Sequence, residues 1–449
     1  MAGPGCRYGS PVSTRTAVLP SLPAAWRARR AAACSPEADA ATHLALRAML
    51  GSRAIVWGAG LLALALFGQK TSVSTSMDVH HLTAPFGSAA ANFLSAPAAR
   101  WDSVWYLTIA HAGYPTPASS AFFPLYPLLI RGGALVLGSE LIAGTLISFL
   151  AMTAGLYLLH RLVRLDLAPA QARATVMLVA FFPASLFLSA VYTEALFLML
   201  SVGAIYAARL ERWAWSGVLG ALAAATRSGG VLLVVPLMWL YLYGPRSGGE
   251  LAVLAGRRRG WVPRYRIGRS VAWLALVPAG LLAYMGYLGL AHHAPLAAFQ
   301  AEAVWGRHFA GPFGGLLKAL ADAPTDLRLG LSGHTVAVGA AAPVSWQTHN
   351  LIDLALVGFA AAGLVLSRRR IPLAYTVYAV ALLVQALSYP VVLEPLESFP
   401  RYLLVIFPVF MGWGAWLGER PRLYGRVIAS SAALLAGFSA LWAIWAWVA

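Results

Sequence analysis

A segment that follows the first hydrophobic run of this chain concentrates side chains that could do chemistry. Residues 100–114, RWDSVWYLTIAHAGY, hold Arg100, Asp102, His111 and Tyr114 among further aromatic residues. A carboxylate beside aromatic side chains at a membrane boundary can act as a general base, because partial burial tunes its pKa. Asp102 is therefore the first candidate for a catalytic residue.

The same segment also fits a purely structural role. On a helix, Trp101, Trp105 and Ile109 would share one face suited to the headgroup region of a membrane. In that alternative, Asp102 is a solvated residue paired with Arg100. Spacing within this segment leaves both interpretations open.

Two further clusters favour a functional site. The stretch 180–197, AFFPASLFLSAVYTEALF, places Tyr192 and Glu194 in a turn between two short apolar runs, and ATRSGG at 225–230 places Arg227 at the end of another. An arginine near mid-depth costs roughly 2.5–3.5 kcal/mol, so it is a functional candidate by default. A phosphate is its natural partner. A snorkelling side chain or an ion pair with Glu194 is the alternative.

A last cluster, ESFPRYLLVIFP at 397–408, adds Arg401 and Tyr402. No DxD motif occurs in the segments between apolar runs, and DAPTD at 322–326 is typical of a solvated loop. We therefore expect neither a required metal nor another cofactor.

The amino-acid composition predicts the class of protein whose elements position these residues. Of the 449 residues, 59% are hydrophobic and 11% are charged, whereas a soluble domain carries roughly 25% charged residues. The chain is predicted to be an all-α polytopic membrane protein. Its net charge of +17 does not indicate nucleic-acid binding, because most arginines lie in short loops between apolar runs.

About eleven spans are predicted from the apolar runs. They cover 54–69, 141–160, 174–191, 195–209, 213–227, 229–244, 271–291, 351–367, 371–388, 402–418 and 427–448. The segment 122–138 has two prolines and a central arginine, which favours a re-entrant or interfacial helix.

The basic residues also predict the orientation. With residues 1–48 as a disordered basic tail on the cytoplasmic side, most Lys and Arg residues fall on that side, including the Arg-rich loop 245–269. The transmembrane domain 49–449 then has two long outer loops, 70–121 with a helical part and 292–350. We expect a multi-pass cell-membrane protein whose site faces the periplasmic or extracytoplasmic side.

Taken together, five blocks resemble the PIG-V-type mannosyltransferases, relatives of the enzyme that adds the second mannose to glycosylphosphatidylinositol. The blocks are RWDSVWYLTIAHAGY, AFFPLYPLLIR, FFPASLFLSAVYTEALF, LAAATRSGG and SFPRYLLVIFP, between Arg100 and Pro408. The resemblance implies the GT-C architecture and a polyprenyl-phosphate sugar donor. The Arg-, Ala- and Gly-rich composition indicates a bacterial member, which leaves the acceptor open.

The resemblance also implies site roles. Asp102 stands in the family's WD element as the acid–base residue, and the remaining motif positions are His111 and Tyr114, Glu194 of YTE, Arg227 of TR and Arg401 of RY. Fixed cationic groups stabilise the negative charge that develops on the leaving phosphate. We expect Arg227 and Arg401 to fill this role, with Arg100 as a reserve candidate. Sugar orientation falls to residues that include Trp105, His111, Tyr114 and Glu194, with Tyr192 and Tyr402 as further candidates.

We thus expect a mannosyltransferase that acts by inversion on a lipid, glycan or protein acceptor. A retaining route with Glu194 as nucleophile stays open, as does transfer of arabinose, glucose or galactose. The Pro- and Gly-interrupted stretch from Phe122 to Gly138 and the FFP at 181–183 are candidate walls for the polyprenyl chain. A lipid or sugar transporter is the alternative class, but it predicts inverted repeats, and the sequence contains no evident repeat.

Overall fold

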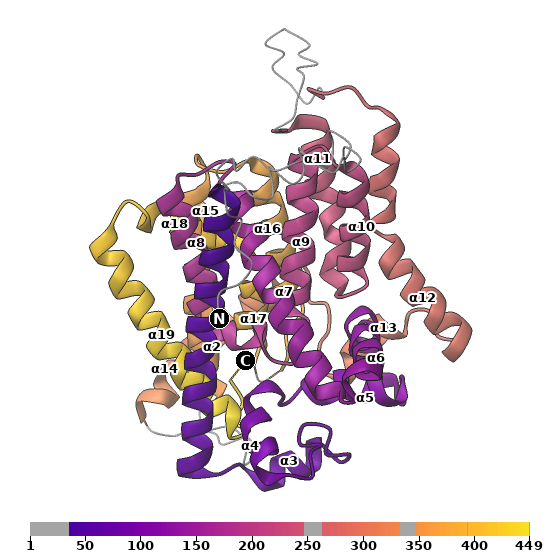
Figure 1. Ribbon diagram of the computed structural model, residues 1–449, viewed down its shortest axis with the longest axis vertical. Helices are drawn as coiled ribbons and strands as arrows, with labels where there is room; N and C mark the ends of the chain where they lie inside the picture. The colour runs from indigo at the N-terminus through magenta and orange to yellow at the C-terminus, as the bar shows by residue number, and fades with distance from the viewer. Residues whose placement is uncertain (1–35, 247–262, 333–345, 393, 449) are drawn as a thin grey trace, which may run out of the picture.

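The structure, a computed structural model, describes residues 36–246, 263–332, 346–392 and 394–448, and every regular element in these ranges is a helix (Figure 1). Within these ranges, four helices are long and apolar enough to cross a membrane, and they lie within α2 (Pro36–Phe67), α7 (Glu140–Val163), α15 (Trp346–Ser367) and α19 (Pro421–Ala443). A fifth crossing arises if η5 (Arg269–Leu276) and α12 (Ala279–His292), bent by 43°, form one span. The all-helical membrane class is confirmed, whereas the predicted number of about eleven spans is not.

The remaining apolar helices are short or interrupted. They are α6 (Leu125–Leu137), α8 (Pro169–Phe181), η3 (Pro183–Leu188), α9 (Glu194–Arg209), α10 (Trp213–Ala224), η4 (Ser228–Leu233), α11 (Val234–Tyr243), α16 (Leu373–Ala386) and α18 (Phe407–Leu417). The predicted span 174–191 shows why, since Pro183 follows the end of α8 and begins a separate 3-10 helix. With 13 residues, α6 is roughly 20 Å long. It is therefore too short to cross a hydrocarbon core of about 30 Å.

The first helix begins well before the predicted first span. The expected disordered tail over 1–48 is wrong from Pro36 onward, where α2 starts with two acidic residues, Glu37 and Asp39, in its first turn. Acidic side chains at this end stabilise the helix dipole. Residues 1–35 and most of the loop 245–269 lie outside the described ranges.

Short elements that connect the apolar helices gather at one end of the molecule. In Figure 1, α3, α4, α5, α6 and α13 all lie toward the lower end of the view. The elements of this end and its neighbourhood are α3 (Thr71–Met77), α4 (Ala89–Ser95), η1 (Ala96–Ala98), α5 (Ser103–Ala112), η2 (Pro117–Ala121), α13 (Ala297–Val304), α14 (Gly314–Ser332) and α17 (Phe399–Leu404). The two predicted outer loops thus carry helices, although 333–345 lies outside the described ranges. The expectation of a solvated loop at 322–326 is wrong, because this segment lies within the 19-residue helix α14.

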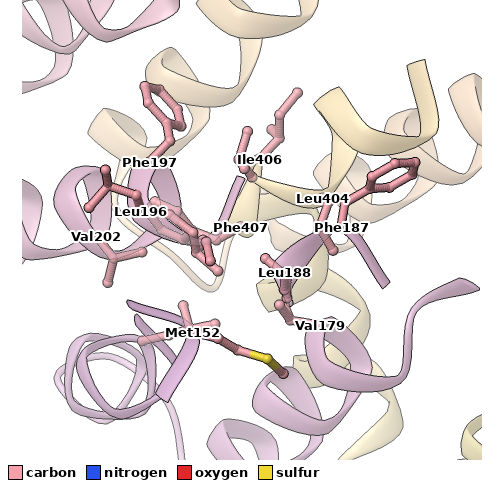
Figure 2. Packing of buried hydrophobic residues seen from close by; sticks show 14 of the residues in the cluster. Met152, Val179, Phe187, Leu188, Leu196, Phe197, Val202, Leu404, Ile406 and Phe407 are labelled. Carbon is pink, nitrogen blue, oxygen red and sulfur yellow. The ribbon is translucent and has the colours of Figure 1, made fainter. Parts of the chain in front are cut away.

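A continuous apolar core supports this end from behind. Figure 2 shows side chains from α7, α8, η3, α9 and the α17–α18 segment meeting in it, among them Met152, Val179 and Phe407. Phe197 and Ile406 of this cluster also line the main cavity described below. The floor of the cavity is therefore part of the packed core.

A buried arginine ties α2 to the turn that precedes α9. Arg53 is 4% exposed, and its guanidinium donates to the carbonyl of Ser185 at 2.6 Å and to the hydroxyls of Ser189 and Ser185 at 2.7 and 2.9 Å. It also donates to the carbonyl of Ala180 at 3.3 Å. The 3-10 turn has free carbonyls because its helix is broken, and Arg53 satisfies them.

Candidate functional site

A cavity of about 550 Å³ lies among α5, α9, the turn between α10 and η4, α17 and the outer segment around α13. Six of the ten site residues predicted from the sequence line it, namely Asp102, Trp105, Glu194, Arg227, Arg401 and Tyr402. They come from four segments far apart in the chain. The structure therefore brings the four sequence clusters to one cavity.

Asp102 and Arg401 form the first ion pair of this cavity. Arg401 Nη1 lies 2.5 Å from Asp102 Oδ2, and the two side chains are 12% and 18% exposed. The Asp102 side chain does not cap α5, although the residue stands at its N-terminus. The carboxylate is thus directed to an arginine 299 positions along the chain.

Unusual backbone conformations precede both partners of this pair. Trp101, directly before Asp102, has φ 52°, and Ser398, the N-cap of the helix that carries Arg401, has φ 69°. A side chain in the left-handed region is strained, and such strain clusters at functional sites. The predicted helical face of Trp101, Trp105 and Ile109 is wrong for Trp101, because α5 begins only at Ser103.

Glu194 and Arg227 form a second ion pair at the same cavity. Their Oε1 and Nη1 atoms lie 2.8 Å apart, with Glu194 2% and Arg227 19% exposed. Glu194 opens α9, while Arg227 follows the end of α10 in an extended conformation. The ion pair with Glu194, which the sequence analysis gave as the alternative to phosphate binding by Arg227, is present. Both of its partners line the cavity.

Three guanidinium groups surround the ring of Tyr402. The carbon centres of Arg227, Arg307 and Arg401 lie 5.0, 5.6 and 5.6 Å from the ring centroid. Arg307 also donates to the Tyr402 hydroxyl at 3.0 Å and lies 3.7 Å from a carboxylate oxygen of Glu397. Burial raises the pKa of the Glu397 carboxyl, and the neighbouring Arg307 acts in the opposite direction.

Indole rings form much of the remaining wall. Trp105 stacks on Phe122 with centroids 5.6 Å apart and meets Trp305 edge-on at 5.4 Å. Trp101 meets Trp447 edge-on at 5.1 Å. Aromatic faces combined with a few charged groups are typical of a small-molecule site.

Four predicted site residues do not line the cavity. Arg100 is 2% exposed and donates to the backbone carbonyls of Ala443 and Ala99. It therefore packs the C-terminal segment against residues 97–101 instead of facing the cavity. The predicted reserve role of Arg100 in phosphate binding does not fit this placement.

His111 and Tyr114 also lie elsewhere. His111 is exposed and pairs with Glu140 at 3.1 Å, because it stands at the end of α5 away from Asp102. The Tyr114 hydroxyl donates to the carbonyl of Phe122 at 2.9 Å. Tyr192 is buried beneath the cavity, and its hydroxyl accepts the backbone N–H of Asp102 at 3.0 Å.

Of the two segments predicted to line a path for the polyprenyl chain, only one contributes residues to the cavity. Phe122 and Phe123 line the cavity, whereas Phe182 packs within the core against Phe359 and Phe410. The stretch 181–183 therefore belongs to the core.

Sequence reasoning missed several residues at the cavity. Arg307 had a signal, because it is one of the few basic residues that the charge distribution leaves on the outer side. Glu397, Trp305 and Trp447 also line the cavity. The two tryptophans stand in segments without a recognisable motif, so no sequence signal marked them.

The fold and the site define a membrane-embedded helical protein with paired arginines and carboxylates in an aromatic cavity near one end. Residues 49–244 match the family model of the mannosyltransferases (PIG-V). The chain is 34% identical over 239 residues to the mouse GPI alpha-1,6-mannosyltransferase 2, covering 47% of this chain and 46% of the mouse protein. It is 35% identical over 156 residues to the human GPI alpha-1,6-mannosyltransferase 2, covering 31% and 30% of the two chains. A GPI mannosyltransferase 2 of Cryptococcus neoformans is 26% identical over 160 residues, or 33% and 38% of the two chains.

The resemblance inferred from the sequence is thus confirmed: residues 49–244 match the PIG-V-type mannosyltransferases, and the named relatives are GPI mannosyltransferases. The aligned region spans less than half the length of each of these relatives. The family match over residues 49–244 includes Asp102, Glu194 and Arg227, while Arg401 lies beyond it. The relatives are animal and fungal proteins, and the bacterial origin stays a prediction.

Proposed function

We propose that this chain is a membrane mannosyltransferase that moves mannose from a polyprenyl-phosphate donor to an acceptor hydroxyl on the outer face. The observation that carries the proposal is the Asp102–Arg401 pair in a cavity that also holds the Glu194–Arg227 pair. One carboxylate and one or more arginines at a single cavity are what glycosyl transfer from a phosphate requires. The family of residues 49–244 supports the choice of mannose.

In the proposed reaction, the acceptor hydroxyl attacks the anomeric carbon of the donor. A new carbon–oxygen bond forms as the bond from that carbon to the phosphate oxygen breaks, and the hydroxyl proton passes to Asp102. The polyprenyl phosphate leaves with one more negative charge than it had in the donor. A single displacement of this kind inverts the anomeric configuration.

The arginines would stabilise the leaving phosphate. Arg227 and Arg401 both face the cavity and contact one ring, that of Tyr402. Guanidinium groups bind phosphate bidentately, and their contribution grows as the charge on the phosphate develops. Arg307, whose guanidinium carbon lies 5.6 Å from the centroid of the same ring, would add to the positive field.

The other cavity residues would orient the sugars. Glu194 has one oxygen bound to Arg227, while its Oε2 is buried and has no hydrogen-bond partner among the described residues. This second oxygen can accept a sugar hydroxyl, and the indole of Trp105 offers an apolar face to the ring. In a retaining route Glu194 would act as the nucleophile instead, and the anomeric configuration of the product distinguishes the two.

The test uses membranes that contain the wild-type chain, Asp102→Asn, Arg227→Ala or the control Asp322→Asn, whose carboxylate is 39% exposed and paired with Lys318. Radiolabelled polyprenyl-phosphate mannose is supplied, and transfer to endogenous acceptors is measured. We expect labelling by the wild type and the control, and a loss of roughly 10²–10⁴-fold in Asp102→Asn.

The outcomes separate the parts of the proposal. Full activity of Asp102→Asn would contradict the assignment of the base. If the wild type transfers no mannose but transfers arabinose, glucose or galactose from the same kind of donor, the sugar is wrong. If it transfers none of these sugars, the transferase proposal fails.

A further inference from the structure

A second, smaller cavity adjoins the main one. Its volume is about 110 Å³, and Trp447 lines both cavities. The polar residues of its wall are His349, Asp353 and Glu394, and the rest of the wall is apolar and aromatic. None of these three residues lines the main cavity, so they have no part in the proposed transfer reaction.

The three polar side chains come together from two elements. His349 and Asp353 are one turn apart on α15, and Glu394 lies in the segment before α17. His349 Nδ1 is 3.4 Å from Glu394 Oε1. Asp353 is 3% exposed and Glu394 is 2% exposed. The cavity thus has two almost fully buried carboxylates in its wall.

Each of these carboxylates has an oxygen without a partner. Asp353 Oδ2 and Glu394 Oε2 are buried and accept no hydrogen bond from any residue that the structure describes. Within the described ranges, neither carboxylate forms an ion pair with a lysine or arginine. A buried carboxylate is strongly disfavoured unless a cation or donor satisfies it, so this cavity calls for a positively charged donor.

We propose that the second cavity binds a small primary ammonium group. An ammonium carries three N–H donors, enough for the free oxygens of Asp353 and Glu394. A short alkyl chain would pack on the apolar wall, and the aromatic rings of Trp447 and Phe438 attract a cation. The space equals that of three or four water molecules at about 30 Å³ each, which suits methylammonium or ethanolamine.

The donor set favours an ammonium over a metal ion. Among the described residues, no group of three or more His, Cys, Asp or Glu side chains could hold a metal ion. An alkali or alkaline-earth ion prefers about six oxygen ligands, whereas this wall offers two carboxylates in apolar surroundings.

The test measures the thermal unfolding temperature (Tm) of the full chain in detergent at pH 7. Methylammonium and ethanolamine are titrated against potassium and tetramethylammonium chloride at equal ionic strength. We expect Tm to rise by several degrees with the primary amines, since a ligand that binds only the folded state stabilises it. Potassium and tetramethylammonium, which lack N–H donors, are expected to have no such effect.

Two amide variants and a surface control make the test specific. Asp353→Asn and Glu394→Gln should each lose the amine effect, and without amine each should be at least as stable as the wild type, because a buried charge is removed. Asp322→Asn, a partly exposed carboxylate on α14, should keep the amine effect. The proposal is overturned if the wild type shows no amine-specific rise or if both variants retain it.

A further arm identifies the source of the ammonium group. The chain is placed in nanodiscs of phosphatidylethanolamine or of phosphatidylcholine, and added methylammonium is titrated into each. A lipid headgroup as the ligand predicts a higher Tm in phosphatidylethanolamine and a weak response to added amine there. A free amine as the ligand predicts the same response in both lipids. These readouts need no transfer activity, so they stand even if the proposed reaction fails.

Discussion

The hydroxyl of Tyr192 holds the backbone of Asp102. It accepts the Asp102 N–H at 3.0 Å and lies 3.4 Å from the carbonyl oxygen of Arg100. Tyr192 is 1% exposed and packs against Phe187 and Trp442 at centroid distances of 5.0 and 5.5 Å. Tyr192, which the sequence predicted to be a site residue, therefore lies beneath the cavity. It holds the backbone of Asp102, the proposed base.

Replacing Tyr192 by Phe should lower the rate constant of transfer without changing the Michaelis constant for the donor. The change leaves the buried N–H of Asp102 unpaired, which costs about 1–3 kcal/mol, and displaces the carboxylate. Misplacement by about 1 Å can cost a factor of about 10² in rate. Steady-state kinetics measure both constants. Tyr126→Phe, which removes a buried hydroxyl bonded to Ser148 outside the cavity, serves as the control.

Two arginine substitutions should separate binding from packing. Arg227 faces the cavity, whereas Arg100 is buried against the C-terminal segment. Arg227→Lys should raise the Michaelis constant for the donor at least tenfold, because lysine loses the bidentate grip on phosphate. Arg100→Lys should lower Tm and leave that constant unchanged. An equal rise in both variants would contradict the assignment of these residues.

Arg53→Met should destabilise the folded protein strongly. Its guanidinium satisfies acceptors of the turn that leads to Tyr192 and Glu194, and methionine would leave them buried and unpaired. We expect a loss of roughly 3–5 kcal/mol, seen as a lower Tm or as loss of folded protein. Arg47→Met on the exposed side of the same helix should change stability little. A Tm of Arg53→Met equal to that of this control would refute the role.

A pair of glycine substitutions tests how closely α15 and α18 approach each other. A methyl group on Gly412 would overlap the backbone carbonyl of Gly363, whereas one on Gly437 meets nothing within 4 Å. Gly412→Ala should therefore prevent normal folding, because two backbones cannot separate without repacking the core. Gly437→Ala should be neutral or slightly stabilising, since alanine favours helix. The yield of monodisperse protein in detergent reports both results.

The sequence predicted which residues line the cavity better than it predicted the number of membrane-spanning helices. Asp102, Glu194, Arg227 and Arg401 each stand beside a short motif, and charge conflicts with an apolar neighbourhood at every one of them, so local reasoning found them. His111 and Tyr114 share a motif with Asp102 but lie elsewhere, because α5 separates them: Asp102 stands at its N-terminus, His111 is in its last turn and Tyr114 follows its end. A shared sequence motif therefore did not mean a shared cavity.

The missed residues depend on long-range packing. Trp305 and Trp447 reach the cavity from segments without a motif, so only the fold reveals them, whereas the charge distribution alone marked Arg307. The number of membrane-spanning helices was hard to predict for a different reason. Apolar content marks a segment as buried, but breaks such as the one at Pro183 decide whether it becomes one long helix or two short ones.

The Asp102–Arg401 contact bears on hydrolysis of the sugar donor by water. The Asp102 oxygen Oδ2 is held by the guanidinium of Arg401 at 2.5 Å, so this oxygen is not free to accept a proton from a hydroxyl group. In the proposed reaction, the donor phosphate competes for Arg401 and releases Asp102 at the moment when a sugar is in place. An empty cavity would then hold no activated water, and the costly lipid-linked sugar would be protected from wasteful hydrolysis.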